Sequence, residues 1–376
     1  MPAYEIRPFD AQCIAELGPF LTRSLEALSL GPGASGEDGL QSLNQSEATD
    51  DYRWLLDEGN PAQTEGIPAG EIIRNDQGAI VGMIGFHPLY FRYGDRRLLG
   101  LGAHNFFVDP TARMQGFMLF RRYLNNPKAD FCFSTTCNTN SGPLWAKCGA
   151  VHLPDSDSEY LLVLRYGPVL KELAIKKGVP KAVASVLLLA GPPAGLVLRP
   201  RGKHSGLKCE RCDDWERLSA IAERNRDPTR VTPERSAKVL QRRFDAMCRD
   251  ARSSGSLDGI YRFTASSGHE GWFLISAKLR GSTGQVRGLD LLDVVWPRGS
   301  LEFSSVISAV IEVAGSRADV LSIRDRSAWG LHPGLLGARR RTFPAQEAFV
   351  YSRAGSGLPQ PAELAPIADL PTAFGV

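Results

Sequence analysis

Two histidines in the first half of the sequence could carry proton-transfer chemistry. His104 and His87 lie in neighbouring strand-like runs, 96–110 and 79–93. An imidazole titrates near neutral pH, so either ring is a candidate general base. His104 is the first candidate, because it lies on the fourth of the strand-like runs. Strand alternation would place residues 104 and 106 on one face and residues 105 and 107 on the other. A structural role is the alternative for both rings.

The stretch FVDPTARMQGFMLF, residues 107–120, is typical of a strand that turns into a helix. Pro110 ends the strand, and a helix-compatible apolar run follows. The first N–H groups of a helix lack internal acceptors and lie at the positive end of its dipole, so such a turn can bind phosphate. Gly116 would let a ligand approach the main chain, and Arg113 adds positive charge. On its own, an Arg-x-x-Gly sequence is more often a surface turn.

The segments around this turn alternate between strand and helix patterns. The hydrophobic periodicity predicts a strand, a helix, a polar loop, a helix, three antiparallel strands, a helix, a strand, a short helix and a strand. Their ranges are 4–10, 11–28, 29–48, 49–59, 70–75, 79–93, 96–110, the helix after Pro110, 129–137, 141–149 and 159–166.

The second half repeats this order in pattern, though not in residue identity, which indicates a duplication. Its predicted helices cover 215–225, 234–247 and 301–315, and its strands cover 259–266, 271–280, 286–297, 318–325 and 347–353. We therefore predict a domain over 1–166, a connector over 167–206, a second domain over 207–354 and a tail over 355–376.

Two motifs in the first half resemble those of the GNAT N-acetyltransferase superfamily. The stretch Val108-x-Pro110-x-x-Arg113-x-x-Gly116 resembles its acetyl-CoA motif, with Met118 in place of a small residue. The stretch NTNSGPLWAKCGA, residues 138–150, resembles its later motif, in which an asparagine precedes a helix. Here Trp145 stands where the family often has a tyrosine that serves as an acid. The resemblance covers about residues 70 to 165.

This resemblance implies an α/β fold class of two tandem GNAT-like domains, each a mixed, mostly antiparallel sheet flanked by helices. It also implies acetyl-CoA or another acyl-CoA as co-substrate, with pantetheine between strands that splay apart near Val108 and Thr136. The cofactor-binding residues would be Phe106, Phe107, Val108, Arg113, Met114, Gln115, Gly116, Phe117, Met118, Asn138 and Trp145. The catalytic residues would be His104, His87 and Asn140. Helix capping is an equal alternative for Asn138 and Asn140.

The function that follows is an N-acyltransferase, first of all an N-acetyltransferase, acting on a small-molecule amine by direct attack in a ternary complex. The second half lacks the Arg-x-x-Gly core, so we expect one cofactor site. One alternative is a Fem-like transferase that uses aminoacyl-tRNA. Another is a catalytically dead binding module, since Met118 and Trp145 depart from the family pattern.

The composition limits the partners. The formal charge of +3 balances 44 basic against 41 acidic residues, so no nucleic acid is expected, and Arg339–Arg341 is interpreted as a solvated edge. Seven scattered cysteines and a charged N-terminal segment indicate a cytoplasmic protein. Cys209-x-x-Cys212 has no second ligand pair, so no metal is expected. Glycines and prolines interrupt the apolar run 182–198, so a buried inter-domain helix is favoured over a membrane span or a peripheral membrane contact.

Overall fold

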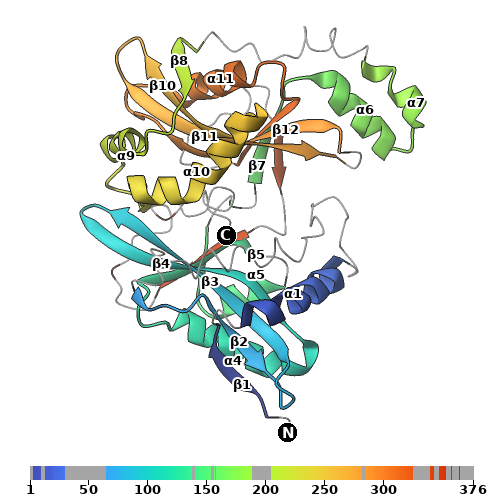
Figure 1. Cartoon of the computed structure of the whole chain (residues 1–376), viewed down its shortest axis with the longest axis vertical. Coiled ribbons are helices and arrows are strands. Elements are labelled where there is room, and N and C mark those ends of the chain that lie inside the picture. The colour runs from blue at the N-terminus through green and yellow to red at the C-terminus, as the bar shows by residue number, and fades with distance from the viewer. Residues whose placement is uncertain are drawn as a thin grey trace. The chain divides into compact units, whose positions relative to one another are not determined.

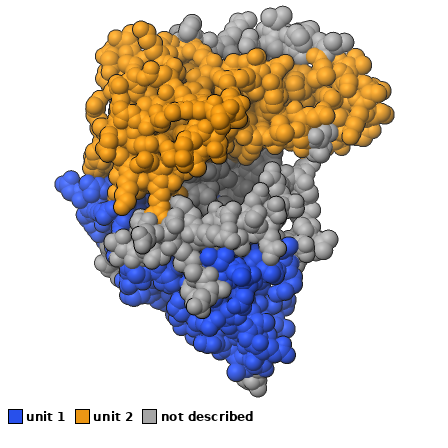
Figure 2. Space-filling model, in the orientation of Figure 1, with its two compact units in different colours: residues 1–152, 348–360, 376 blue, residues 153–347, 361–375 orange. Residues whose placement is uncertain are grey.

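The computed structural model describes residues 3–9, 13–29, 65–137, 140–153, 156, 158–188, 205–281, 284–324, 339–342, 347–352, 357 and 364. The predicted helix 49–59 lies outside these residues, as do nearly all of the loop 29–48 and the tail 355–376. The chain divides into two compact units (Figure 2). Unit 1 holds residues 1–152, 348–360 and 376, and unit 2 holds residues 153–347 and 361–375.

Unit 1 is built on one mixed sheet, of which Figure 1 labels β1 to β5. The strands follow the order β1-β2-β3-β4-β5-β15-β6. The strands are β1 (Glu5–Pro8), β2 (Gly70–Arg74), β3 (Ile80–Tyr93), β4 (Arg96–Val108), β5 (Phe131–Cys137), β15 (Glu347–Tyr351) and β6 (Val151–His152). The helices are α1 (Ile14–Ser29), α4 (Arg113–Leu124) and α5 (Ser141–Lys147). The predicted meander is confirmed: β2, β3 and β4 are antiparallel, and β4 pairs in parallel with β5.

Helices α1 and α4 cover opposite faces of this sheet. Neighbouring residues of a strand point to opposite faces. Ile72 packs in the cluster that contains Leu17 of α1, whereas Ile73 packs in the cluster that contains Leu119 and Phe120 of α4. Each face of the sheet is therefore covered by a helix at β2.

Unit 2 repeats the topology of unit 1. Its sheet follows the order β14-β7-β13-β12-β11-β10-β8. The strands are β7 (Ser158–Val163), β8 (Leu207–Arg211), β10 (Gly259–Ala265), β11 (Glu270–Arg280), β12 (Val286–Val295), β13 (Val320–Arg324) and β14 (Arg339–Thr342). The helices are α6 (Tyr166–Lys176), α7 (Lys181–Ala184), α9 (Trp215–Arg224), α10 (Ala237–Ser254) and α11 (Phe303–Ala314), and β9 covers Thr232–Pro233. As in unit 1, three antiparallel strands lead through a helix to a parallel strand.

Two strands lie in sheets that their order in the sequence does not suggest. β7, predicted in the first domain, pairs with β13 in the sheet of unit 2. β15, predicted in the second domain, lies between β5 and β6 in the sheet of unit 1. Arg339–Arg341, interpreted from sequence as a solvated edge, belong to strand β14, which pairs with β7. The predicted connector contributes α6 and α7 to unit 2.

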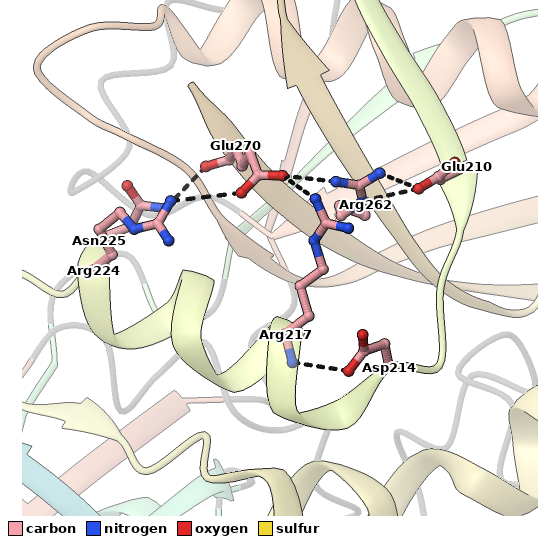
Figure 3. A network of polar contacts seen from close by, with 7 residues as sticks. All are labelled: Glu210, Asp214, Arg217, Arg224, Asn225, Arg262 and Glu270. Carbon is pink, nitrogen blue, oxygen red and sulfur yellow. Dashed lines mark hydrogen bonds and ion pairs between the residues drawn. The ribbon is translucent and has the colours of Figure 1, made fainter. Parts of the chain in front are cut away.

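A network of charged side chains ties α9 to the edge of the second sheet (Figure 3). Glu270 of β11 accepts hydrogen bonds from Arg217 of α9 and Arg262 of β10, both at 2.7 Å. Arg262 also pairs with Glu210 of β8. Since these charges are paired with one another, the network holds elements together and is not a candidate catalytic site.

Candidate functional site

Strands β4 and β5 run side by side for only part of their length. Their parallel register covers Gly100–Gly102 and Phe131–Phe133. β4 then continues to Val108 and β5 to Cys137, and no further pairs join these described residues. The end of this register is therefore the candidate place for a ligand between the two strands.

Tyr123 of α4 lies at the point where this pairing ends. Its hydroxyl is within hydrogen-bonding distance of the carbonyl oxygens of Leu101 (2.5 Å) and Phe133 (3.0 Å). The ring is fully buried, and burial raises the pKa of Tyr123 well above its ordinary value. The residue therefore stays protonated and links both strands to the helix.

A β-bulge reshapes the end of β4. Gly85 of β3 pairs with His104 and Met83 pairs with Phe107, so three residue steps on β4 face two on β3. Asn105 has φ of +49°, a left-handed conformation that asparagine tolerates better than most residues. A bulge bends the strand and redirects its side chains.

The bulge changes which residues share a face. Ala103 and Phe106 pack in the cluster under α4, and Phe107 packs in the cluster under α1. His104, next to Ala103, points away from α4 and so shares its face with Phe107. The prediction that residues 104 and 106 share a face is wrong, because the extra residue at Asn105 breaks the alternation.

The two candidate histidines come together on this face. Their ring centroids lie 6.1 Å apart in an edge-to-face arrangement. Gly85 makes room for them, since a Cβ there would lie 2.4 Å from Nε2 of His104. His87 is buried, and burial lowers the pKa of His104 to about 4. His104 is thus neutral at pH 7, although it does not titrate near neutrality as the sequence analysis assumed.

Helix α4 begins directly after the open end of β4. A 3₁₀ turn over Pro110–Ala112 leads into it, and no side chain caps either start, so Asp109 does not cap the turn. The first turn has no acidic residue. Such an end leaves backbone N–H groups and a positive dipole for an anion.

Gly116 has a packing role that the sequence analysis did not predict. A Cβ at this position would lie 2.8 and 2.9 Å from the two Cγ atoms of Val108. The glycine therefore lets α4 pack closely against the end of β4, and it faces the protein, not an open ligand cradle. Arg113, Met114, Phe117 and Met118 lie on the exposed side of the helix, and Gln115 is half-buried.

The residues of the second motif lie in different environments. Trp145 is 2% exposed and packs against Phe120 and Tyr123, with ring centroids 5.2 and 5.8 Å away. Little of its indole is left to touch a ligand. Asn140 is exposed and makes no capping hydrogen bond to α5. Asn138 lies outside the described residues.

Three residues of this region escaped the sequence analysis: Tyr123, Asn105 and Gly85. Nothing in the sequence around Tyr123 distinguishes a tyrosine that links two strands from an ordinary aromatic residue of the core. An asparagine inside an apolar strand is a signal for a bulge, and a glycine inside a strand is a signal for close approach.

No protein-family model matches the sequence, and no curated protein sequence matches it. Solved structures do resemble the fold. The N-myristoyltransferase of Saccharomyces cerevisiae, with bound myristoyl-CoA, is 10% identical with a TM-score of 0.55, over 97% of this chain and 85% of that one. A probable N-acyltransferase of Enterococcus faecalis V583 is 10% identical with a TM-score of 0.51, over 94% and 73%. A GCN5-related N-acetyltransferase of Anabaena variabilis ATCC 29413 is 12% identical with a TM-score of 0.50, over 93% and 72%.

These similarities define the class of fold. The chain has the mixed α/β fold of the GNAT superfamily, and the likeness extends over nearly its whole length. The expectation of a GNAT-like fold is confirmed. Among the described helices, none is long and apolar enough to cross a membrane.

Proposed function

We propose that this protein is an acyl-CoA-dependent N-acyltransferase that acts in the cytoplasm on a small-molecule amine. The observation that carries the proposal is the open end of β4 and β5, where two parallel strands stop pairing beside an uncapped helix start. The similar fold of the yeast N-myristoyltransferase, which holds myristoyl-CoA, supports an acyl-CoA as the donor. Acetyl-CoA is the first donor to test.

The donor side lies along β4 and the start of α4. Pantetheine would bind the main chain between Phe106 and Val108, and the pyrophosphate would bind the first N–H groups of α4, which lack acceptors within the helix. Arg113 supplies positive charge there. The side chain of Trp145 no longer belongs to the proposed contacts, because it is buried among aromatic rings.

The acceptor side lies on the face that carries His104 and His87. The amine nitrogen attacks the thioester carbon, loses a proton, and the tetrahedral intermediate expels the CoA thiolate, which takes up a proton. A neutral His104 accepts a hydrogen bond from the amine and receives its proton as the N–C bond forms, when that proton becomes more acidic. This role is that of a weak base.

One cofactor site, in unit 1, is consistent with the start of α11 in unit 2. Its fourth residue is Val306, where α4 has Gly116, and Glu302 immediately precedes its first turn. A carboxylate beside the helix start repels a phosphate. Unit 2 would then contribute to acceptor binding or stability.

Isothermal titration of acetyl-CoA, myristoyl-CoA and free CoA tests the donor. Gly116→Glu is unsuitable as a probe, because it would disrupt the packing against Val108. Arg113→Glu changes an exposed side chain at the proposed pyrophosphate site, and Arg249→Glu makes the same charge change on an exposed arginine of unit 2. We expect binding by the wild type, at least tenfold weaker binding by Arg113→Glu, and no change for Arg249→Glu.

Catalysis is then tested with a panel of amines, and the release of the CoA thiol is measured as the readout of turnover. His104→Gln should lower kcat and leave the affinity for the donor unchanged. If the wild type binds none of the three CoA compounds, the donor assignment fails. Donor binding without turnover of any amine would instead support a binding module.

A further inference from the structure

A helical hairpin in unit 2 presents an apolar surface with lysines around it. α6 and α7 meet at a tight turn, in which Gly178 has φ of +84° and donates to the carbonyl of Ile175 at 2.9 Å. Val179 donates to the carbonyl of Ala174 at 3.0 Å, which completes a Schellman-type helix end. Figure 1 shows the two helices together at one edge of the unit, away from β8 and α9.

Large apolar side chains on this hairpin are exposed. Leu173 of α6 is 49% exposed, and Val183, Val186 and Leu188 are 60%, 62% and 42% exposed. The favoured sequence interpretation of 182–198 as a buried helix is therefore not met in the part of that run that the structure describes, 182–188. Exposed apolar side chains gathered on one element mark an interaction surface.

The charges around the turn are positive, and the nearest acidic residue along α6 is the half-buried Glu172 before Leu173. Lys176, Lys177 and Lys181 are exposed and flank the turn. The sequence holds no acidic residue from Leu173 to Cys209. The hairpin thus offers apolar side chains and lysines to the same partner, which favours an anionic one.

The residue types favour a lipid surface over a protein. Protein interfaces are enriched in arginine and aromatic residues and depleted of lysine. The tip of this hairpin, residues 173–188, contains lysine, valine and leucine, with neither arginine nor an aromatic residue. A lysine can keep its ammonium group among lipid headgroups while its stem lies along apolar surface.

The base of the hairpin is fixed to the sheet, so the tip is held in a set position on unit 2. Lys171 donates to Gln285 at 3.0 Å, and Arg165, just before α6, pairs with the buried Asp319 at 3.5 Å. These contacts hold Lys171 and Arg165 at the base, and Lys177 and Lys181 of the tip are exposed.

We propose that this lysine-flanked hairpin, residues 173–188, docks the protein on the surface of an anionic lipid bilayer. The apolar side chains enter the headgroup region and the lysines bind the acidic headgroups. The contact is peripheral and reversible. It is independent of the proposed acyl transfer, and it adds a membrane partner to a chain that has no described membrane-spanning helix.

Vesicle sedimentation of the full-length protein tests this docking. The vesicles are phosphatidylcholine alone and phosphatidylcholine mixed with phosphatidylglycerol, each at low and high salt. We expect binding to the mixed vesicles at low salt only, since salt screens the lysines. Each lysine near an anionic surface contributes about a factor of five to the binding constant. Lys177→Glu/Lys181→Glu should therefore weaken binding more than tenfold.

The matched control is Lys208→Glu/Lys238→Glu, which makes the same charge change at exposed positions on β8 and α10. It should bind as the wild type does, within about twofold after the net-charge change. Val183→Ser/Val186→Ser tests the apolar part and should also lose binding. Equal weakening by both lysine pairs overturns the proposal, because it would reflect net charge alone. A wild type that stays off anionic vesicles also overturns it. If that protein self-associates in sedimentation velocity unless Val186 is replaced, the surface belongs to a second copy.

Discussion

At the scale of single residues, the site depends on a histidine that is kept neutral. The ring of His104 occupies the space that Gly85 leaves open, beside the ring of His87. Burial disfavours the charged imidazolium, which is why the pKa of His104 falls to about 4. The same burial that weakens it as a base keeps it unprotonated over the whole physiological range.

This burial predicts an acid sensitivity. In the unfolded chain His104 takes up a proton near pH 6.5, whereas the folded ring does so only near pH 4. Its contribution to stability is therefore present above about pH 6.5 and declines as the pH falls toward 4. Between pH 7 and pH 5, the melting temperature of His104→Gln should fall less than that of the wild type. His269→Gln, at an exposed histidine, is the control, and its melting temperature should fall as much as that of the wild type. An equal fall in melting temperature in all three proteins would show that burial does not lower the pKa of His104.

At the scale of elements, the contact between β4 and α4 decides whether the donor site forms. Val108 ends the strand, and Gly116 lies over it in the helix. Part of this arrangement could be predicted from the sequence, because Pro110 and the apolar run after it signal a strand followed by a helix. The contact itself could not, since it depends on how closely two elements approach. The sequence pattern therefore predicts a ligand-facing glycine, whereas Gly116 packs on the side chain of Val108.

Gly116→Ala tests this close approach. A methyl group would meet the Val108 side chain at under 3 Å. Overpacking costs about 1–3 kcal/mol, which exceeds the gain of about 1 kcal/mol from replacing a helical glycine. We expect a net loss in urea denaturation. Gly116→Ala/Val108→Ala should be more stable than the sum of the two single changes implies, because the smaller residue at 108 makes room. Strict additivity would show that the two residues do not touch.

The charged network of unit 2 is the second element-scale feature with a measurable consequence. A hydrogen bond from Arg217 is the largest cause of the lowered pKa of Glu270, and Arg262 contributes further. A carboxylate with a depressed pKa stabilises the fold above its unfolded pKa, and this is lost as the pH falls through the folded pKa.

Glu270→Gln should therefore destabilise unit 2 at pH 7 by about 1.5 kcal/mol. The gap to the wild type should narrow as the pH falls below about 4.3, where the unfolded carboxylate becomes protonated. Glu223→Gln, at an exposed glutamate that pairs with Arg226, should cost less than about 0.5 kcal/mol. Urea denaturation at pH 7 and pH 3.5 separates these expectations. A gap that widens at low pH would contradict the assigned charge state.

At the scale of the whole molecule, local and long-range information in the sequence differ in value. The meander, the helix after Pro110 and the repeated pattern of the second half could be predicted, because hydrophobic periodicity is a local property. The positions of β7 and β15 could not, because strand pairing over a long stretch of chain leaves no mark in either segment. For the same reason, a chain boundary at residue 166 looks natural in the sequence and separates β7 from the sheet in which it pairs.

The exchanged strands make a prediction about fragments. A fragment of residues 1–166 lacks β15, so β5 and β6 lose the strand that lies between them. A fragment of residues 207–354 lacks β7, so β13 and β14 lose the strand that lies between them. Each missing strand leaves unpaired main-chain groups and an exposed apolar edge inside the sheet. We expect neither fragment to show a cooperative thermal transition, whereas the intact chain does. Circular dichroism melts check this, with amide dispersion in NMR spectra as a second readout. A cooperative melt of fragment 1–166 alone would show that unit 1 closes its sheet without β15, and the two halves would then be independent domains.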